Sequence, residues 1–361
     1  MTDESYIQLA LEIAKKGTGE VSPNPLVGCI LVKNDRIIGA GYHHKFGANH
    51  AEINAFENAK ESVDGSTLYV NLEPCSHFGK TPPCTDQIIA KKIKRVVIGT
   101  LDMNPLISGN GVKKLKSAGI EVKVGVLEND CIALNKFFFK YITSKTPYVS
   151  LKAAQTLDGR IADLTGGSQW ITSMESRKFV HKLRSNYDAV LVGAGTVVKD
   201  DPSLTVRLTD GRNPRRIILD STLSLKTDKK LFTRNSDGKT ILITSKNNRE
   251  KRKIRKLETL GVKVLFAKTD KNGNLNLKSM LRELAKNNIA SVLVEGGSRV
   301  FSSFVRSGFY DDIFLFISPK IIGDGVPVIG NIGIKDIKRT INVKIKSYDM
   351  IGDDLLLRLE Q

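Results

Sequence analysis

Short apolar runs alternate with polar stretches along the chain, and their lengths and periods predict strands and helices in turn. Two apolar runs, at 27–33 and 36–43, are separated only by Asn34-Asp35, which is typical of a β-hairpin. The other elements predicted in the first 145 residues are helices at 51–59, directly after Cys84 and at 111–118, and strands at 67–72, 95–100 and 121–124. Together they indicate an α/β domain with a mixed sheet and helices on its faces.

A second α/β series begins at Tyr148. It comprises predicted strands at 148–154, 188–193, 215–220, 239–244, 262–266, 290–294 and 310–318, and helices at 173–185, 249–260, 277–287 and 298–307. A chain of 361 residues exceeds the usual single domain, so we expect two. We place the boundary within 137–147, where an aromatic run is followed by TSKTP, giving domains at 1–145 and 146–361.

The N-terminus and the overall composition indicate a cytoplasmic globular protein. Ile7, Leu11 and Ala14 share one face of a predicted amphipathic first helix, whose acidic start is unlike a secretory signal. Apolar residues make up 40% of the chain and charged residues 26%, which is ordinary for a globular protein. No apolar run approaches the roughly 18 residues that a membrane span needs, so no membrane contact is expected.

The formal net charge of +18 admits three explanations: nucleic-acid binding, attraction of a phosphorylated small substrate, or a general lysine bias. Many of the lysines occupy scattered helical positions, as in 91–94 and 251–256. Such runs are typical of solvated helix faces. The charge alone therefore does not predict a nucleic-acid partner.

The four cysteines are too few for a disulfide framework in a chain of this length. Cys29 lies in the apolar run LVGCILV and Cys131 near ALNKFFF, so both are expected to be core thiols. Cys75 and Cys84 lie in the polar, proline-rich stretch EPCSHFGKTPPC. Metal ligation explains that pair better than packing does.

The motifs around this pair indicate a zinc site that catalyses hydrolysis. An H-A-E motif at 50–52 starts a predicted helix, a strand ends in E-P-C at 73–75, and Cys84 follows. A hydrolytic zinc site has three protein ligands and an open position for water, and one imidazole with two thiolates would supply three. Because His50 and Glu52 would diverge on a regular helix, we expect His50 at the helix entry, where Glu52 could shuttle protons to a leaving amine. The motifs match the zinc-deaminase signature, except that eight residues separate the cysteines.

EPCSHFGKTPPC, with SPNPLVG upstream, resembles the deaminase domain of the RibD family of bifunctional riboflavin-biosynthesis enzymes. The resemblance implies a cytidine-deaminase-like three-layer α/β domain, with His50, Cys75 and Cys84 as zinc ligands and Glu52 as the proton shuttle. That family removes the ring 2-amino group of a diaminopyrimidinone ribosylamine 5′-phosphate and then reduces the ribosyl group to ribityl. The substrate would be a small phosphorylated pyrimidine.

Five further polar residues are candidates to contact this substrate. Asn24, held between two prolines, could hydrogen-bond the pyrimidine or the ribose. Asp102 and Asn104 follow a predicted strand, at the end where α/β sites usually open. His77 and Lys80 lie between the two cysteines and could meet the phosphate.

The second domain has a glycine-rich turn but no dinucleotide fingerprint of the G-x-G-x-x-G kind. GAGTVV at 193–198 lacks the third glycine and precedes a polar loop, KDDP at 199–202, which disfavours a Rossmann fold. A predicted strand ends in Gly296-Gly297-Ser298 before a helix, so backbone N–H groups could bind an anion there, with Arg299 nearby.

Four segments of this half, KAAQTLDGRIA, SQWIT, VGAGTVVKDDPSLTVR and LVEGGS, resemble the reductase domain of the same family. This implies a dihydrofolate-reductase-like fold that uses NADPH. The matching positions imply NADPH contacts at Ala154, Trp170, Thr196, Asp200 and the turn at Gly297, Ser298 and Arg299, with Ser221 a further candidate, and substrate contacts at Ser168, Arg184, Leu204, Arg207 and Glu295. The forked guanidinium groups of Arg184 and Arg207 suit a 5′-phosphate.

Two other functions stay open at this point. A zinc deaminase could act on a base in tRNA or single-stranded DNA, but it would need a basic surface with aromatic side chains, and aromatic residues are only 6% of the chain. A nucleic-acid-binding protein with a structural zinc would need four protein ligands, and His77 could be the fourth. We expect instead a homo-oligomeric enzyme that binds neither nucleic acid nor membrane.

Overall fold

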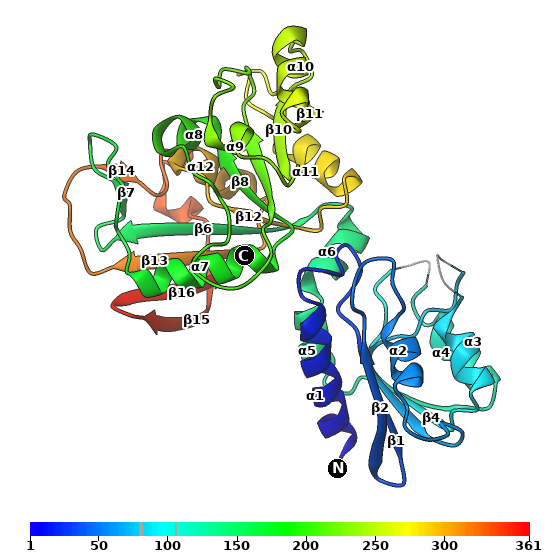
Figure 1. Cartoon of the computed structure of the whole chain (residues 1–361). Helices are drawn as coiled ribbons and strands as arrows, with labels where there is room; N and C mark the ends of the chain where they lie inside the picture. Colours follow the sequence, from blue (N-terminus) through cyan, green and yellow to red (C-terminus); the bar gives the residue numbers. More distant parts are fainter. Residues whose placement is uncertain (79–81, 105–106) are drawn as a thin grey trace. The chain divides into compact units, whose positions relative to one another are not determined.

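The computed structural model describes residues 1–78, 82–104 and 107–361, which form two compact units, Met1–Lys145 and Thr146–Gln361 (Figure 1). Each unit has its own sheet and its own hydrophobic core. Within the described ranges, none of the helices combines the length and the apolar character needed to cross a membrane.

The first unit is built on a five-stranded mixed sheet with the order β2-β1-β3-β4-β5. Its strands are β1 (Gly28–Lys33), β2 (Arg36–Tyr42), β3 (Thr67–Leu72), β4 (Arg95–Thr100) and β5 (Glu121–Val124). Strand β1 pairs antiparallel with β2 and β3, whereas β3, β4 and β5 run parallel. Asn34 and Asp35 both have positive φ, as the two-residue turn of a hairpin requires, so the predicted hairpin is confirmed.

Helices cover both faces of this sheet, which gives three layers (Figure 1). Alternate residues of β1 supply the two cores: Ile30 packs with α1 and α5, and Leu31 with α2, α3 and α4. The helices are α1 (Asp3–Ala14), the 3-10 turn η1 (Lys15–Gly17), α2 (Ala51–Glu57), α3 (Cys84–Ala90), α4 (Asn110–Ser117), α5 (Glu128–Leu134) and α6 (Lys136–Ser144). The fully buried Cys29 and Cys131 are core thiols, as predicted.

The end of this unit differs from the sequence-based expectation. We treated 137–147 as a connecting segment, but most of it belongs to helix α6, and α5 precedes it. The residues before Pro147 are compatible with a helix until Lys145, whose left-handed φ of 55° ends α6. Three successive phenylalanines concealed the helical period in this segment.

The second unit contains a nine-stranded sheet with the order β11-β10-β9-β8-β12-β6-β13-β16-β15. Its strands are β6 (Tyr148–Thr156), β8 (Ala189–Gly193), β9 (Arg215–Leu219), β10 (Thr240–Ser245), β11 (Lys263–Ala267), β12 (Ser291–Val294), β13 (Asp312–Ser318), β15 (Lys344–Ile351) and β16 (Asp354–Glu360). All neighbours from β11 to β13 run parallel, whereas β16 pairs antiparallel with both β13 and β15. A separate short pair joins β7 (Arg160–Ala162) to β14 (Val326–Pro327).

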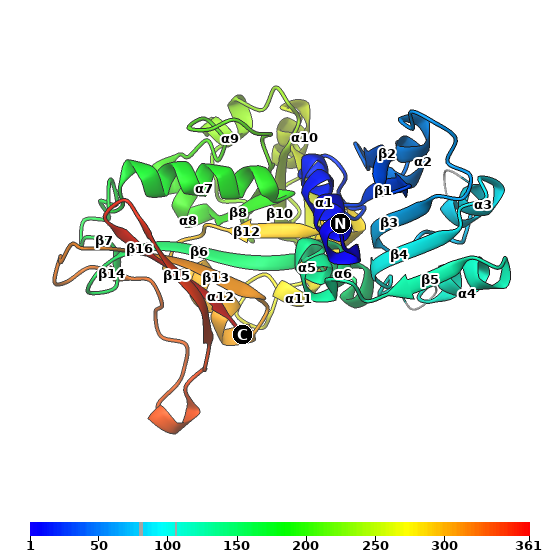
Figure 2. The ribbon, with the colours of Figure 1, turned by 90° about the horizontal axis from the view of Figure 1, so that it is seen from below.

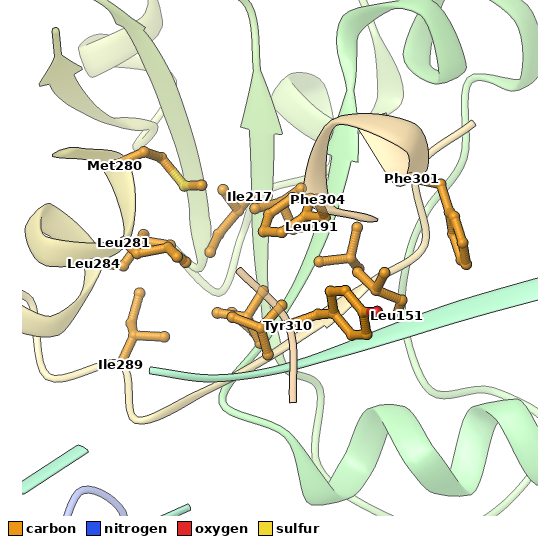
Figure 3. Close-up of a cluster of buried hydrophobic side chains, with 14 of the residues drawn as sticks. Leu151, Leu191, Ile217, Met280, Leu281, Leu284, Ile289, Phe301, Phe304 and Tyr310 are labelled. Atoms are coloured by element: carbon orange, nitrogen blue, oxygen red, sulfur yellow. The ribbon is translucent and has the colours of Figure 1, made fainter. Parts of the chain in front are cut away.

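Helices pack on both faces of this sheet, with α7 and α12 on opposite sides (Figure 2). The helices are α7 (Met174–Asn186), α8 (Ala194–Asp200), α9 (Lys230–Thr233), α10 (Lys251–Thr259), α11 (Leu277–Lys286) and α12 (Ser298–Ser307), with a 3-10 turn η2 (Ile337–Arg339). The main core lies where α11 and α12 meet the strands, and Figure 3 shows Phe304 of α12 beside Leu191 and Ile217 of the strands. Burial of these side chains holds the parallel strands in place, so their carboxyl ends form a fixed edge.

Two expectations for this unit need correction. The residues Lys199 and Asp200 do not lie in a loop, because they form the last turn of α8, which starts directly after β8. No strand was predicted beyond residue 318, whereas β15 and β16 extend the sheet by a hairpin. Strand β15 has the sequence KIKSYDMI and is exposed along most of its length, so its pattern lacks the buried face that identifies a strand.

Candidate active sites

Three side chains with metal-binding atoms converge at the carboxyl end of β3. His50 is the N-cap of α2, Cys75 follows β3, and Cys84 begins α3. The His50 Nδ1 atom lies 3.2 Å from Cys84 Sγ and 3.5 Å from Cys75 Sγ, and the three ligand atoms all lie within 4.8 Å of one another. The expectation that His50 stands at the helix entry is confirmed. One imidazole and two thiolates form a donor set that suits a zinc ion with one open position.

The environment favours an ionised Cys75 and a protonatable carboxylate, whereas the hydrogen bond with Cys75 and burial raise the pKa of Cys84. A hydrogen bond from Cys84, together with His50, lowers the pKa of Cys75, which favours a thiolate before any metal is considered. Glu52, in the first turn of α2, is buried, and burial followed by the nearby charge of Cys75 raises its pKa to about 7. A carboxylate with such a pKa can both accept and release a proton near neutral pH.

The cluster opens into a cavity of about 350 Å³. Glu52, Asn24, His77, Asp102 and Asn104 all line it, so the structure brings the described deaminase candidates together. Lys80, the remaining candidate, lies outside the described residues. The cavity has room for a single ring and its substituents.

His43 belongs to the same cavity and was missed in the sequence. Its Nε2 accepts a hydrogen bond from the amide of Asn24 at 3.1 Å, and its Nδ1–H donates to the Asn49 carbonyl at 3.0 Å. Burial lowers the pKa of His43, which keeps this ring neutral. Its ring stands edge-on to His50, with centroids 5.6 Å apart. The only signal in the sequence was its place at the end of a predicted strand.

Glu73 is a second residue whose role was missed, although it begins the E-P-C motif. Its Oε2 accepts the N–H groups of Asp102 at 3.2 Å and Gly109 at 2.9 Å, and its Oε1 accepts that of Gly111 at 2.8 Å. A Cβ on Gly111 would lie 2.3 Å from the Pro74 carbonyl oxygen, so glycine is required for this approach. The buried carboxylate thus attaches the segment that begins at Asp102 to the strand that carries the cysteine ligand.

The second unit has its own cavity, of about 620 Å³, at the carboxyl ends of parallel strands. Its walls include the proposed substrate residues Ser168, Arg184, Leu204, Arg207 and Glu295. Arg184 forms a forked ion pair with Glu295, at 2.7 and 2.8 Å, and donates to the Thr205 carbonyl at 3.1 Å. Among the described residues, the Arg207 side chain has no hydrogen-bond or ion-pair partner. Arg207 is therefore the freer of the two guanidinium groups.

The predicted cofactor residues line this cavity or one that shares its wall. Ala154, Trp170, Thr196, Asp200, Gly297 and Ser298 line the first, and Ser221 and Arg299 line a neighbouring cavity of about 500 Å³ that also includes Thr196, Asp200, Gly297 and Ser298. The Gly297 N–H donates to Thr196 Oγ1 at 3.2 Å, which joins the starts of α8 and α12. Trp170 is 56% exposed, and the Arg177 guanidinium stacks on its ring at 4.0 Å.

Lys152 and His181 are residues of this cavity that the sequence analysis did not name. Lys152 lies on β6, and burial lowers its pKa, although the charge of Glu295 opposes that effect. Its signal was a lone lysine inside an otherwise apolar strand. His181 lies on α7 and accepts a hydrogen bond from the Arg207 backbone N–H at 2.9 Å.

Known families account for both units. Residues 1–100 match the cytidine and deoxycytidylate deaminase zinc-binding region, and residues 147–357 match the RibD C-terminal domain. The riboflavin biosynthesis protein RibD of Aquifex aeolicus is 50% identical over 98% of this chain and 97% of its own length. The chain belongs to the RibD family. The Escherichia coli RibD protein is 36% identical over 99% of both chains.

Solved structures of RibD proteins agree over the full length. A diaminohydroxyphosphoribosylaminopyrimidine deaminase/5-amino-6-(5-phosphoribosylamino)uracil reductase from Thermotoga maritima is 45% identical, with a TM-score of 0.88, over 99% of this chain and 98% of its own. RibD of Acinetobacter baumannii is 35% identical, with a TM-score of 0.89 and the same coverage. The family membership confirms a cytidine-deaminase-like domain joined to a dihydrofolate-reductase-like domain.

As a RibD protein, the chain is a bifunctional riboflavin-biosynthesis enzyme, a deaminase and a reductase. The alternative of a deaminase for bases in nucleic acid is not favoured. A structural zinc is not favoured either. Among the described residues, the metal-binding group contains His50, Cys75 and Cys84 only, and His77 is not part of it.

Proposed function

We propose that the chain hydrolyses the ring 2-amino group of a diaminopyrimidinone ribosylamine 5′-phosphate in the first unit and reduces the ribosyl group to ribityl in the second. The observation that carries the proposal is the buried Glu52 beside the His50, Cys75 and Cys84 cluster in one small cavity. The function printed for the Thermotoga maritima relative supports the substrate. We assign the deaminase to 1–145 and the reductase to 146–361.

In the first unit, His50, Cys75 and Cys84 hold a zinc ion. Zinc bound there supplies Lewis-acid activation of a water molecule. Glu52 accepts a proton from the attacking water and delivers it to the amino group, which leaves as ammonia. Its burial next to the cluster supplies the pKa that both transfers need.

The cavity walls orient the pyrimidine for this attack. Asn24, fixed by His43, and the strand-end residues Asp102 and Asn104 offer donors and acceptors to the ring and ribose. His77, which lines the cavity, binds the phosphate together with Lys80, which lies outside the described residues. Asp102 and Asn104 keep their place because Glu73 holds the backbone at Asp102.

In the second unit, the residues that would hold NADPH line the two adjoining cavities: Ala154, Trp170, Thr196, Asp200, Ser221, Gly297, Ser298 and Arg299. When bound, NADPH would supply the hydride that reduces C1′ of the sugar, and a proton from solvent would supply the second hydrogen. Ser168, Leu204, Arg184 and Glu295 shape the substrate half of the cavity. Arg207, whose guanidinium is unpaired within the described residues, binds the 5′-phosphate.

We also propose that the chain forms homo-oligomers and works in the cytoplasm, where thiol ligands stay reduced. The edge strand β15 supports self-association, because Ile345, Tyr348 and Met350 are exposed at 65%, 73% and 65%. Light scattering on size-exclusion fractions tests it. Replacing Tyr348 and Met350 by lysine should lower the mass of the particle if this edge is the contact.

Mass spectrometry of the products tests both activities. Without NADPH, the diaminopyrimidinone phosphate should exchange its 2-amino group for oxygen and release ammonia. With NADPH, the product should gain two further hydrogens. No ammonia from this substrate, or ammonia only after RNA is added, would overturn the proposed deaminase.

A further inference from the structure

Helix α7 presents three basic side chains to the reductase cavity. Arg177, His181 and Arg184 are spaced i, i+4 and i+7, which places them on one face of the helix. All three line the cavity. Arg177 stacks on Trp170 and Arg184 pairs with Glu295, whereas His181, only 4% exposed, has no role in the proposed function.

The hydrogen bond to His181 determines the state of its ring. The backbone N–H of Arg207 donates to His181 Nδ1 at 2.9 Å, so Nδ1 carries no proton and a neutral ring carries it on Nε2. A protonated ring would lose this bond. Burial, followed by the charges of Arg184 and Arg207, lowers the pKa of His181 to about 4, which keeps the ring neutral at neutral pH.

The position of Arg207 depends on a small number of attachments. The stretch 201–214, all of it described, is neither helix nor strand. Near Arg207 it is held by three hydrogen bonds, in which Asn213 Oδ1 accepts the N–H of Val206, the Thr205 carbonyl accepts from Arg184, and His181 accepts the N–H of Arg207 itself. The last of these joins the main chain of Arg207 to α7.

We propose that His181 is a positioning residue of the reductase, which holds the main chain of Arg207 so that its guanidinium faces the substrate phosphate. A neutral imidazole suits this place, because another cation beside Arg184 and Arg207 would repel both. This inference rests on the proposed role of Arg207 in phosphate binding.

Side-chain geometry separates this role from simple packing. An asparagine can place its amide oxygen near the position of Nδ1, whereas a glutamine amide reaches only the position of Nε2 and a leucine offers no acceptor. His181→Asn should therefore keep the KM for the deaminated substrate within about threefold of wild type. His181→Gln and His181→Leu should raise it by about tenfold, the effect of one lost hydrogen bond of ordinary strength. Lys182→Leu, on the exposed side of α7, is the matched control and should leave KM unchanged.

The decisive measurement is a double-mutant cycle with Arg207→Ala in the full chain. If His181 acts through Arg207, His181→Leu should add less than about twofold to the KM of the Arg207→Ala variant. Multiplicative effects, or a His181→Asn variant as impaired as His181→Leu, would overturn the inference. If Arg207→Ala alone leaves KM unchanged, the proposed role of Arg207 in phosphate binding is refuted, and the positioning role of His181 with it.

Two readouts exclude a general loss of structure. Ammonia release by the first unit should be unchanged in every variant, because His181 lies in the second. The Kd for NADPH should also stay within about twofold. If His181→Leu unfolds the second unit, the positioning role can still be tested by comparing the KM values of His181→Asn and His181→Gln, since both side chains are polar and similar in size. Equal KM values for these two would refute the role.

Discussion

The ion pair between Arg184 and Glu295 offers a prediction whose size follows from the structure. The two side chains are 12% and 9% exposed and share two short hydrogen bonds. Glu295→Gln keeps the volume but removes the charge, which leaves Arg184 buried without its counter-ion. Burial alone would raise the pKa of Glu295, but the charge of Arg184, with help from Lys152, outweighs it and lowers the pKa below its usual value.

Removing one partner of a buried pair costs about 3–5 kcal/mol, because the remaining charge stays desolvated. The glutamine oxygen can still accept one hydrogen bond, so we expect the free energy of unfolding of the second unit to fall by about 3 kcal/mol, the lower end of this range. Adding Arg184→Met should restore part of the loss. Restoration should be incomplete, since Lys152 also loses the carboxylate near it. The wild-type pair should lose its contribution as the pH falls through the lowered pKa of Glu295, because a depressed carboxylate pKa stabilises the fold only above that range.

The single tryptophan, Trp170, lies in the second unit, so its fluorescence during urea unfolding reports that unit alone. Ammonia release by the same samples is the internal control for the first unit. Asp349→Asn, in a pair with Arg358 that is 41–47% exposed, is the matched control and should cost less than about 0.5 kcal/mol. A Glu295→Gln variant as stable as this control would refute the reasoning.

Four further outcomes are expected at the first unit and the junction. Cys75→Ser should lose bound zinc by elemental analysis while Cys29→Ser keeps it, because only the former lies in the cluster. Glu52→Gln should keep zinc but lower the rate of ammonia release by about a hundredfold or more; loss of metal would contradict its role. Glu73→Gln turns one acceptor oxygen into a donor that faces N–H groups, so the deamination KM should rise by about tenfold at unchanged zinc content. When the chain is divided near Lys145, the N-terminal piece should keep the deaminase activity and the C-terminal piece the reductase activity. A folded but inactive N-terminal piece would contradict the assignment of the deaminase to residues 1–145.

Much of the first unit could be predicted from the sequence, because its strands and motifs carry strong local signals. The runs that became β3 and β4 are apolar and short, and the H-x-E and P-C elements have few other uses in this order. The same signals failed at α6, where aromatic residues hid the period, and at β15, where neither face is buried. Exposure of an edge strand removes the alternation on which strand prediction depends.

Three of the residues that were missed, Glu73, His181 and His43, share a physical reason, which is a backbone partner. Glu73 and His181 act on backbone N–H groups, and a backbone partner leaves no pattern in the sequence that could predict it. His43 bonds to the carbonyl of Asn49, six residues away along an irregular loop. Motif reasoning finds side chains that meet a metal or a cofactor, since their chemistry restricts the residue type. The groups that hold those side chains in place become visible only when the backbone of distant segments is known. In this enzyme such groups are the Glu73 carboxylate beside the cluster of His50, Cys75 and Cys84 and the neutral His181 imidazole beside Arg207, and each bonds to the backbone of an irregular segment.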